Sequence, residues 1–310
     1  MGKGERPAAG RSAASDGNRD DDLGDGVGDD PDDAAIPRPA TAGGRAGLAA
    51  LLGSPGQALI ALDFDGTLAP IVADPEQARA LPAAVSALAA LSQVVGTLAV
   101  ITGRPALAAV EYGALRQVPG IVVLGHYGRQ RWYAEELSSP PPPPGLAIAR
   151  DRLPEVLARA GAPDGIWVED KADALAVHTR KTADPQNALD RIRAPLLELA
   201  AGTGLRAEPG RLVIELRPPG ADKGLALEDL AAQREPSAIM FCGDDLGDRP
   251  AFRAVRRLRA RGRPGLAVCS GSAEVSDLAG EVDLVVDGPQ GIADLLAAIA
   301  RRTRPDRNEA

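Results

Sequence analysis

Short, continuous apolar runs alternate with longer amphipathic stretches over residues 46–135. The runs at residues 58–62, 97–101 and 121–124 predict buried strands. The stretches at residues 82–95 and 105–116 each begin with proline, which suits the first turn of a helix, and they predict helices. Apolar strands that are separated by helices indicate a parallel sheet covered on both faces.

Residues 145–217 follow a different order. Helices are expected at residues 146–160 and 185–201, and strands at residues 165–169, 174–180, 205–208 and 212–217. The helix–strand–strand order thus occurs twice, with turn signals at residues 170–173 and at Pro209-Gly210. This pattern predicts a small antiparallel sheet with helices on one face.

The alternation of strands and helices resumes over residues 220–302. Helices are expected at residues 223–233, 249–261 and 291–301, and strands at residues 238–242, 266–269 and 283–286. The first block has only three strands and would be an incomplete sheet by itself. We therefore expect residues 46–135 and 220–302 to form one Rossmann-like α/β core, with an α+β cap (αββαββ) inserted at residues 145–217. The alternative is two unrelated domains in tandem.

Proline-rich joints flank the expected cap. Pro140 to Pro144 form a stiff, extended spacer on one side, and Pro218-Pro219-Gly220 stand on the other. These two segments are the expected hinges between core and cap.

The two ends of the chain fall outside this pattern. Residues 1–45 hold ten acidic and six basic side chains and almost no large apolar ones, which predicts a disordered acidic tail. Residues 303–310 are expected to form a short C-terminal tail. The acidic segment lacks the apolar region of a secretory signal, and no run approaches the roughly 20 apolar residues of a membrane span. Its role is either a docking arm or a solvated extension.

The composition narrows the class of protein. The chain has 310 residues, 45% of them hydrophobic and 3% aromatic, which suffices for about two domains with aliphatic cores. A net charge of −8, without a basic stripe, argues against a nucleic-acid partner. Cys242 and Cys269 are the only cysteines and make no disulfide framework, so we expect a cytoplasmic protein without a membrane partner. Nothing in the sequence determines the oligomeric state, and a monomer is the working expectation.

The segment Asp63-Phe64-Asp65-Gly66-Thr67 follows directly on the first expected strand. Strand ends of this kind are where open α/β sheets bind their ligands. Residues two apart on a strand point to the same side, so Asp63 can act as a nucleophile while Asp65 acts as a proton donor. Gly66 permits a sharp turn. The alternative is an ordinary Asp-Gly turn.

Two further residues suit a phosphate group. Thr102 follows the second expected strand, and its hydroxyl stands at the start of a helix. Lys223 opens another expected helix, where a cation is unfavourable unless an anion is bound. The alternatives are an N-cap threonine and a solvated lysine.

Three acidic residues, Asp244, Asp245 and Asp248, follow the strand expected at residues 238–242. Their mutual repulsion would be relieved by a divalent cation. The alternative is a solvated turn in which Asp248 caps a helix.

These signals occur together and in order, each after a strand or at the start of a helix. Over residues 57–302 the chain resembles the haloacid dehalogenase superfamily and, within it, the trehalose-6-phosphate phosphatases. The similar stretches are LDFDGTLAPIVADP (62–75), VITGR (100–104), GHYG (125–128), VEDKADALAVHTR (168–180), VIELRPPGADKGLAL (213–227) and FCGDDLGD (241–248). The stretches at 168–180 and 213–227 are the specific ones, because the others are common to the superfamily.

The resemblance implies a role for each matching residue of the core. Asp63 would become the aspartyl-phosphate, and Asp65 would protonate the sugar oxygen and then activate water. Thr102, Gly103 and Lys223 would bind the phosphoryl group. Mg²⁺ would lie between Asp63, the Asp65 carbonyl and Asp244, with Asp245 and Asp248 in support.

For the cap, the resemblance implies a small-molecule substrate, trehalose 6-phosphate, bound by polar side chains. The cap positions Glu169, Lys171 and Arg180 match motifs that line the sugar side, and Arg104, Glu215 and Arg217 also match family motifs. The chain departs from the family where Gln130 replaces the usual Glu and Gly247 the usual Thr or Ser, and the first change puts a sugar contact in doubt. His126 and His178, the only histidines, fit no metal-ligand pattern.

Two alternatives to this function stay open. One is another capped sugar-phosphate phosphatase, such as one for sucrose 6-phosphate. The other is a catalytically silent phosphosugar-binding regulatory module, against which the intact Asp63, Asp65, Lys223 and Asp244 argue.

Overall fold

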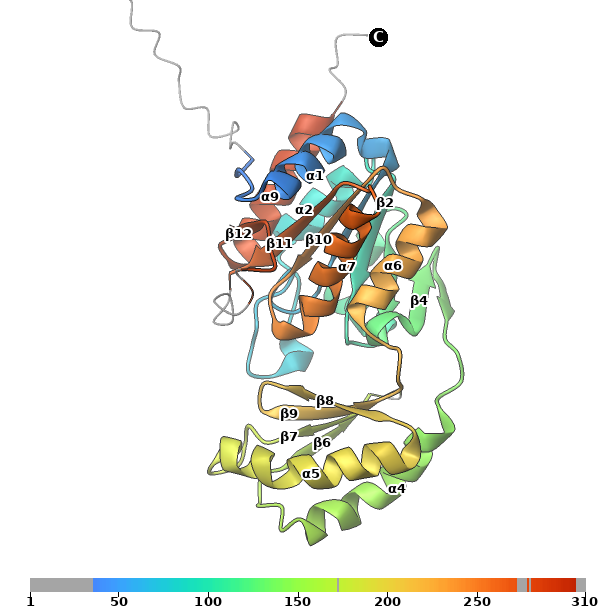
Figure 1. Ribbon diagram of the computed structural model, residues 1–310, viewed down its shortest axis with the longest axis vertical. Coiled ribbons are helices and arrows are strands. Elements are labelled where there is room, and N and C mark those ends of the chain that lie inside the picture. The colour runs from blue at the N-terminus through green and yellow to red at the C-terminus, as the bar shows by residue number, and fades with distance from the viewer. Residues whose placement is uncertain (1–35, 172, 272–277, 279, 305–310) are drawn as a thin grey trace, which may run out of the picture. The chain divides into compact units, whose positions relative to one another are not determined.

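The larger of two β-sheets has eight strands. A computed structural model describes residues 36–304 except 172, 272–277 and 279. The strand order in the large sheet is β12-β11-β10-β1-β2-β3-β4-β5, and the first six strands in this order are parallel (Figure 1). Their bounds are β1 Ala58–Leu62, β2 Thr97–Ile101, β3 Val122–Gly125, β4 Gln130–Tyr133, β5 Glu136–Ser138, β10 Ala238–Gly243, β11 Gly265–Ser270 and β12 Leu284–Val286.

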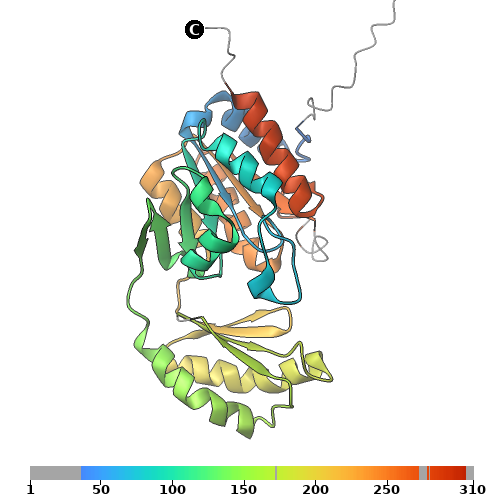
Figure 2. The same cartoon turned by 180° about the vertical axis from the view of Figure 1, so that it is seen from behind.

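Helices cover both faces of this sheet. Side chains of α1, α2, α3 and α9 share one apolar cluster with one set of strand residues, and side chains of α6 and α7 share a second cluster with the alternate set. Figure 2 shows α2 and α9 packed side by side on the first face. The helix bounds are α1 Ala42–Gly53, α2 Pro82–Leu91, α3 Ala106–Tyr112, α6 Lys223–Arg234, α7 Arg249–Ala260 and α9 Gly288–Thr303. The expected parallel, doubly covered α/β core is confirmed.

The central strands bring the candidate residues to one edge of the sheet. β1 lies between β10 and β2, and all three run in the same direction. Asp63, Thr102 and Asp244 each follow the last residue of one of these strands. The Asp63 amide donates to the Cys242 carbonyl at 2.8 Å, so the ladder fixes the first residue of the site as well as the strand.

The second sheet is antiparallel and has four strands in the order β6-β7-β9-β8. The strands are β6 Trp167–Asp170, β7 Leu175–His178, β8 Arg206–Gly210 and β9 Val213–Arg217, and the helices are α4 Pro144–Arg159 and α5 Pro185–Thr203. Apolar side chains of both helices pack with Leu175, Val177, Ile214 and Leu216 on one face. The order α4-β6-β7-α5-β8-β9 is the one expected for the inserted cap.

The hairpin formed by β4 and β5 was not expected. Its residues, Gln130–Tyr133 and Glu136–Ser138, extend the parallel sheet with two antiparallel strands. The turn between them uses Ala134 and Glu135 with positive φ, instead of the Gly or Asn that signals a hairpin in a sequence. None of the helices in the described residues is long and apolar enough to cross a membrane.

The expected boundary of the acidic tail at residue 45 is wrong, because α1 begins at Ala42. Gly44 and Gly47 are buried in this helix, and a Cβ on Gly47 would lie 2.1 Å from the Gly265 carbonyl oxygen. Small residues therefore let α1 approach β11 closely, although their composition resembles that of a disordered segment. Residues 1–35 lie outside the described part of the chain.

Thr41 fixes the start of α1. Its Oγ1 accepts the Gly44 amide hydrogen at 2.9 Å and donates to the buried Asp283 carboxylate. Loss of an N-cap side chain costs about 1 kcal/mol. Thr41→Ala should therefore lower the melting temperature by roughly 2–4 °C, while Thr41→Ser, which keeps the hydroxyl, should not. Thermal unfolding followed by circular dichroism checks this; equal melting temperatures for the two variants would contradict the role of the hydroxyl.

Candidate active site

The turn after β1 depends on a residue without a side chain. Gly66 adopts φ +75°, and a Cβ at this position would lie 2.1 Å from Oδ2 of Asp244. The hydroxyl of Ser270, at the end of β11, donates to the Gly66 carbonyl at 2.6 Å. The turn is thereby held against the neighbouring strand ends, and Gly66 leaves room for the Asp244 carboxylate.

Lys223 joins two carboxylates. Its ammonium lies 2.7 Å from Oδ1 of Asp63 and 2.7 Å from Oδ1 of Asp248, and all three side chains are buried. Lys223 is the first residue of α6, whose N-cap Asp222 accepts the Leu225 amide hydrogen. The start of this helix therefore points a cation at the strand end that bears Asp63.

A third carboxylate, Asp244, completes a group that could hold a metal ion. Asp63, Asp244 and Asp248 each offer a carboxylate oxygen, and these oxygens lie within 4.8 Å of one another. Asp248 also accepts the backbone amide hydrogens of Asp244 at 2.9 Å and Asp245 at 3.3 Å. The Asp245 side chain is exposed and caps the short 3₁₀ helix Leu246–Asp248. The structure thus places Asp248 in the group, and the role of Asp245 as a ligand stays a prediction.

Burial and mutual repulsion favour protonation of these carboxylates. Burial raises the pKa of Asp63 well above its usual range, and Asp248, Asp245 and Asp65 add to this against the opposing charge of Lys223. Burial together with the neighbouring carboxylates raises the pKa of Asp244 to about 9 and that of Asp248 to about 6. Burial alone would lower the pKa of Lys223, but Asp248 and Asp63 outweigh it and raise that pKa well above its usual value.

The site therefore fits a divalent cation. One ammonium contacts two of the three buried carboxylates, and burial together with the repulsion between the carboxylates raises the pKa values of Asp244 and Asp248. Carboxylate oxygens are the ligands that hard cations such as Mg²⁺ prefer. Asp63, Asp244 and Asp248 are the residues that would hold the ion.

Asp65 and Arg104 form a second pair beside the buried group. The guanidinium of Arg104 donates to both carboxylate oxygens of Asp65, at 2.7 and 2.6 Å, and to the Pro75 carbonyl at 2.8 Å. The Asp65 side chain is 41% exposed, in contrast to the buried Asp63. Burial lowers the pKa of Arg104, but the Asp65 hydrogen bond and charge outweigh it and raise that pKa. One carboxylate thus faces the buried cation and the other faces an open side of the site.

Thr102 and Gly103 lie beside a residue that sequence reasoning did not single out, Tyr127. The buried Thr102 hydroxyl accepts the Arg104 amide hydrogen at 3.1 Å, and its carbonyl accepts the Tyr127 amide hydrogen at 2.9 Å. A Cβ on Gly103 would lie 2.7 Å from the phenol oxygen of Tyr127. His126 and Tyr127 both adopt positive φ, 48° and 58°, a strained conformation for residues with side chains. No sequence pattern indicated this strained backbone, which is why Tyr127 was not among the expected site residues.

Three of the expected cap residues lie together on one face of the small sheet. Lys171 lies 3.2 Å from Oε1 of Glu215 and 4.0 Å from Oε2 of Glu169. The Tyr127 hydroxyl donates to Oε2 of Glu215 at 2.6 Å, and the Arg217 guanidinium lies 4.2 Å from the centre of the Tyr127 ring. Burial and the charge of Glu215 raise the pKa of Tyr127 well above 10. These contacts link the cap strand β9 to the loop that carries Thr102.

Arg180 is not part of this cluster. It is exposed, and its guanidinium donates to the Arg211 carbonyl at 3.3 Å, with no interaction to Glu169, Lys171 or Glu215 among the residues that the structure describes. Its role as a substrate ligand stays a prediction.

The two departures from the family pattern have local explanations. Gln130 accepts the amide hydrogen of Ala106 at the start of α3, at 2.9 Å, so it serves the core fold. A Cβ on Gly247 would lie 3.0 Å from Oδ1 of Asp245, which leaves little room for a side chain there.

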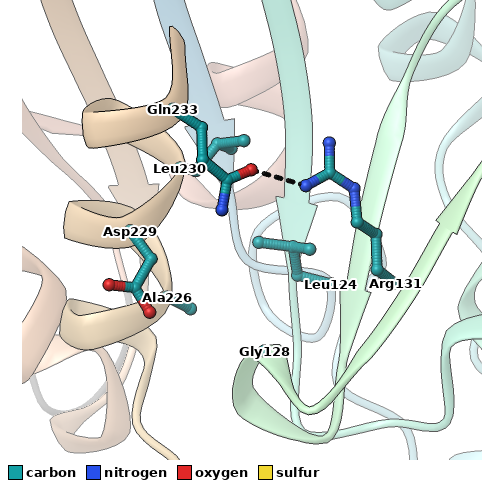
Figure 3. A pocket seen from close by; sticks show the side chains of 7 residues that line it. All are labelled: Leu124, Gly128, Arg131, Ala226, Asp229, Leu230 and Gln233. Carbon is teal, nitrogen blue, oxygen red and sulfur yellow. Dashed lines mark hydrogen bonds between the residues drawn. The ribbon is translucent and has the colours of Figure 1, made fainter. Parts of the chain in front are cut away.

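A separate depression of about 140 Å³ lies between α6 and β4. Figure 3 shows Arg131 and Gln233 pointing toward each other across it, joined by a hydrogen bond of 2.7 Å. None of its seven lining residues is a candidate site residue. The candidate site is instead defined by the converging strand ends and the charged side chains around them.

The structure combines a parallel, doubly covered α/β core and an inserted α+β cap with three buried carboxylates and a lysine at the strand ends. The chain matches the family model of the trehalose-phosphatases over residues 61–284. It therefore belongs to the trehalose-phosphatase family.

Three individual proteins are similar to this chain. An uncharacterized glycosyl hydrolase of Mycobacterium tuberculosis is 36% identical over 208 residues, which is 63% of this chain and 15% of that protein. A trehalose-phosphate phosphatase of Mycobacterium ulcerans is 30% identical over 284 residues, which is 87% of this chain and 63% of that protein. The C-terminal domain of Candida albicans trehalose-6-phosphate phosphatase has the same fold, with a TM-score of 0.67 at 20% identity over 86% of this chain and 99% of that one. The chain thus spans a small part of the first relative and less than two thirds of the second.

The crowded contact between Gly66 and Asp244 gives a first prediction for the site. Gly66→Ala should weaken the binding of a divalent cation at least tenfold, because the added Cβ would displace the Asp244 carboxylate. Gly120→Ala is the matched control, since Gly120 also has positive φ (69°) but has nothing within 4 Å of the point that its Cβ would occupy. Calorimetric titration with Mg²⁺ compares the two variants. Equal affinities would show that Asp244 does not hold the ion.

The raised pKa values give a second prediction. A carboxyl whose pKa rises on folding contributes stability at low pH and loses it as the pH rises toward the folded pKa, here about 9 for Asp244. The cation-free protein should therefore lose stability from about pH 4, near the ordinary pKa of an aspartate, up to about pH 9. Mg²⁺ should raise the melting temperature more at the alkaline end, where it does not compete with protons. Melting curves with Mg²⁺ and with EDTA measure this, and Asp244→Asn should flatten the pH dependence. A Mg²⁺ effect that is independent of pH would refute the coupling.

Proposed function

We propose that this protein is a Mg²⁺-dependent phosphatase that hydrolyses trehalose 6-phosphate to trehalose and phosphate. The observation that carries the proposal is the buried group of Asp63, Asp244, Asp248 and Lys223 at the strand ends. It combines a nucleophile, a place for a cation and a fixed positive charge. Membership of the trehalose-phosphatase family supports the choice of substrate.

In the first step, one Asp63 oxygen attacks the phosphorus atom, and the bond from phosphorus to the sugar oxygen breaks. The sugar leaves with a proton from Asp65, which produces trehalose and an aspartyl-phosphate. In the second step, Asp65 accepts a proton from water, the resulting hydroxide attacks phosphorus, and inorganic phosphate leaves Asp63. A bound Mg²⁺ would supply positive charge that offsets the negative charge of the phosphoryl oxygens.

Lys223 serves both steps. Its ammonium, 2.7 Å from Asp63, favours the ionised carboxylate that attacks and lies where the phosphoryl oxygens gather. Thr102 and Gly103 complete the phosphoryl site through a hydroxyl and a backbone amide.

Arg104 holds Asp65 in place. Its guanidinium donates hydrogen bonds to both oxygens of the Asp65 carboxylate. Asp65 becomes a proton donor when the guanidinium turns to the substrate's phosphate, which is also a bidentate acceptor. The pair therefore links substrate binding to acid catalysis.

The cap selects the sugar. Glu169, Lys171 and Glu215 offer charge-assisted hydrogen bonds to sugar hydroxyls. We assign core function to residues 46–135 and 220–302 and substrate selection to residues 145–217. A monomer in the cytoplasm completes the proposal, and the two buried free cysteines support a reducing compartment.

Phosphate release from a panel of sugar phosphates tests the proposal. Trehalose 6-phosphate should be the best substrate, ahead of sucrose 6-phosphate, glucose 6-phosphate and p-nitrophenyl phosphate. Preference for another sugar phosphate would support the phosphatase mechanism but replace trehalose 6-phosphate as the substrate. No release from any of them in the presence of Mg²⁺ would favour the silent binding module.

Replacement of the nucleophile is the decisive variant. Asp63→Asn should reduce turnover by several orders of magnitude, because it removes covalent catalysis, while circular dichroism shows an unchanged fold. Asp229→Asn, at an exposed position of α6, is the control and should retain parental activity. Residual Asp63→Asn activity within about tenfold of the parent would refute the nucleophile assignment.

A further inference from the structure

Trp167 is an exposed aromatic side chain on the cap. It begins β6, the edge strand of the small sheet, and is 40% exposed. Aromatic residues make up only 3% of the chain, and the other tryptophan, Trp132, is buried. An exposed tryptophan in so aromatic-poor a chain contributes little to a hydrophobic core and suggests a contact with a ligand.

The Trp167 ring is held in a defined orientation. It stacks on the His178 ring with 4.6 Å between the centroids and 20° between the planes. His178 in turn interacts with Glu169, with 3.0 Å between Nε2 and Oε2. The ammonium of the exposed Lys181 lies 5.2 Å from the centre of the Trp167 ring. The ring is therefore fixed by a strand neighbour, and the group above it is a flexible, solvated side chain that a ligand can displace.

Trp167 faces the same side of the sheet as the charged cluster. Trp167 and Glu169 are two residues apart on β6, and Trp167 pairs directly with His178 across the strands. Glu169 on β6 and Glu215 on β9 both pair with Ala176 on the central strand β7, so the two carboxylates lie on the same face of the sheet. The intervening Val168 and Asp170 point to the helix side, where Arg150 of α4 binds Asp170. One face of the cap thus combines carboxylates, an ammonium and a flat apolar ring, which is the set of groups that binds a sugar.

We propose that Trp167, oriented by His178, stacks against the unphosphorylated sugar ring of the substrate and thereby determines the preference for a disaccharide phosphate. This inference rests on the proposed function. The electron-rich face of an indole attracts the weakly positive C–H groups on the apolar face of a pyranose. His178 is a positioning residue, since it acts through the Trp167 ring.

The position along the sheet selects the ring that is bound. Glu215 on β9 contacts Tyr127 of the core, whereas Trp167 lies on β6, two strands further. Two strand spacings separate these positions by roughly 10 Å. The phosphorylated ring must reach Asp63 in the core, so the ring that meets Trp167 is the second one.

Kinetics on three substrates test the proposal. Trp167→Ala should raise KM for trehalose 6-phosphate roughly tenfold, the loss expected for one stacking contact. Values for glucose 6-phosphate, which lacks the second ring, and for p-nitrophenyl phosphate should stay within about twofold. Trp167→Phe, which keeps an aromatic ring, should restore most of the affinity. Val168→Ala, on the opposite face of the same exposed strand, is the matched control and should behave like the parent.

A binding measurement separates this proposal from the proposed function. In the variant Asp63→Asn with Trp132→Phe, Trp167 is the only tryptophan, and trehalose 6-phosphate cannot be turned over. Its addition should change the Trp167 emission, and glucose 6-phosphate should not.

The outcomes are distinct. An emission change without phosphate release by the parent would support the stacking contact and overturn the phosphatase assignment. Phosphate release by the parent with no emission change, or equal losses on all three substrates for Trp167→Ala, would overturn the stacking contact and leave the phosphatase assignment intact.

Discussion

Three buried carboxylates that share one lysine are the constraint on which the rest of the structure depends. Lys223 contacts Asp63 and Asp248, and Asp244 completes the group within 4.8 Å. Burial raises the pKa values of all three carboxyl groups, and the charges of the neighbouring carboxylates raise them further. The neighbouring backbone must also leave room for the carboxylates: a Cβ on Gly66 or on Gly243 would lie within 2.5 Å of one of them. Gly66 and Gly243 therefore leave the space that the carboxylates of Asp244 and Asp248 occupy.

The α/β architecture makes this concentration of charge possible. β1 and β10 are neighbours whose every residue is buried, and their carboxyl ends deliver Asp63 and Asp244 to adjacent positions. α6 starts at the same edge and delivers Lys223. Loops alone would not hold like charges so close, because they would move apart. Two apolar clusters, one on each face of the sheet, supply the rigidity that opposes the repulsion.

Sequence patterns predicted the parts of this structure that depend on local periodicity and on strand ends. The family and the α/β core with its inserted cap are confirmed, and Asp63 lies close to Lys223 and Asp244 in the structure. Helix α1 was missed because a glycine-rich helix that packs closely on a strand has the composition of a disordered segment. The orientations of Asp245 and Asp248 depend on a three-residue 3₁₀ turn, which spacing alone does not determine. Tyr127 contacts Glu215, which is far away in sequence, and Trp167 stacks on His178 of the neighbouring strand; neither contact leaves a sequence pattern.

Chemistry and selection thus depend on different physical interactions. In the core, Asp63, Asp244, Asp248 and Lys223 are buried together, so the change of one of them alters the protonation of the others. On the cap, a chain of contacts runs from the buried Glu215 through Lys171 and Glu169 to the partly exposed His178 and Trp167. The exposed end of this chain is screened by solvent more than the buried group of the core. Tyr127 is the residue that joins the two sets, since its backbone is bound to Thr102 and its hydroxyl to Glu215. His126 and Tyr127 adopt positive φ, and the two contacts of Tyr127 help to hold this strained backbone in place.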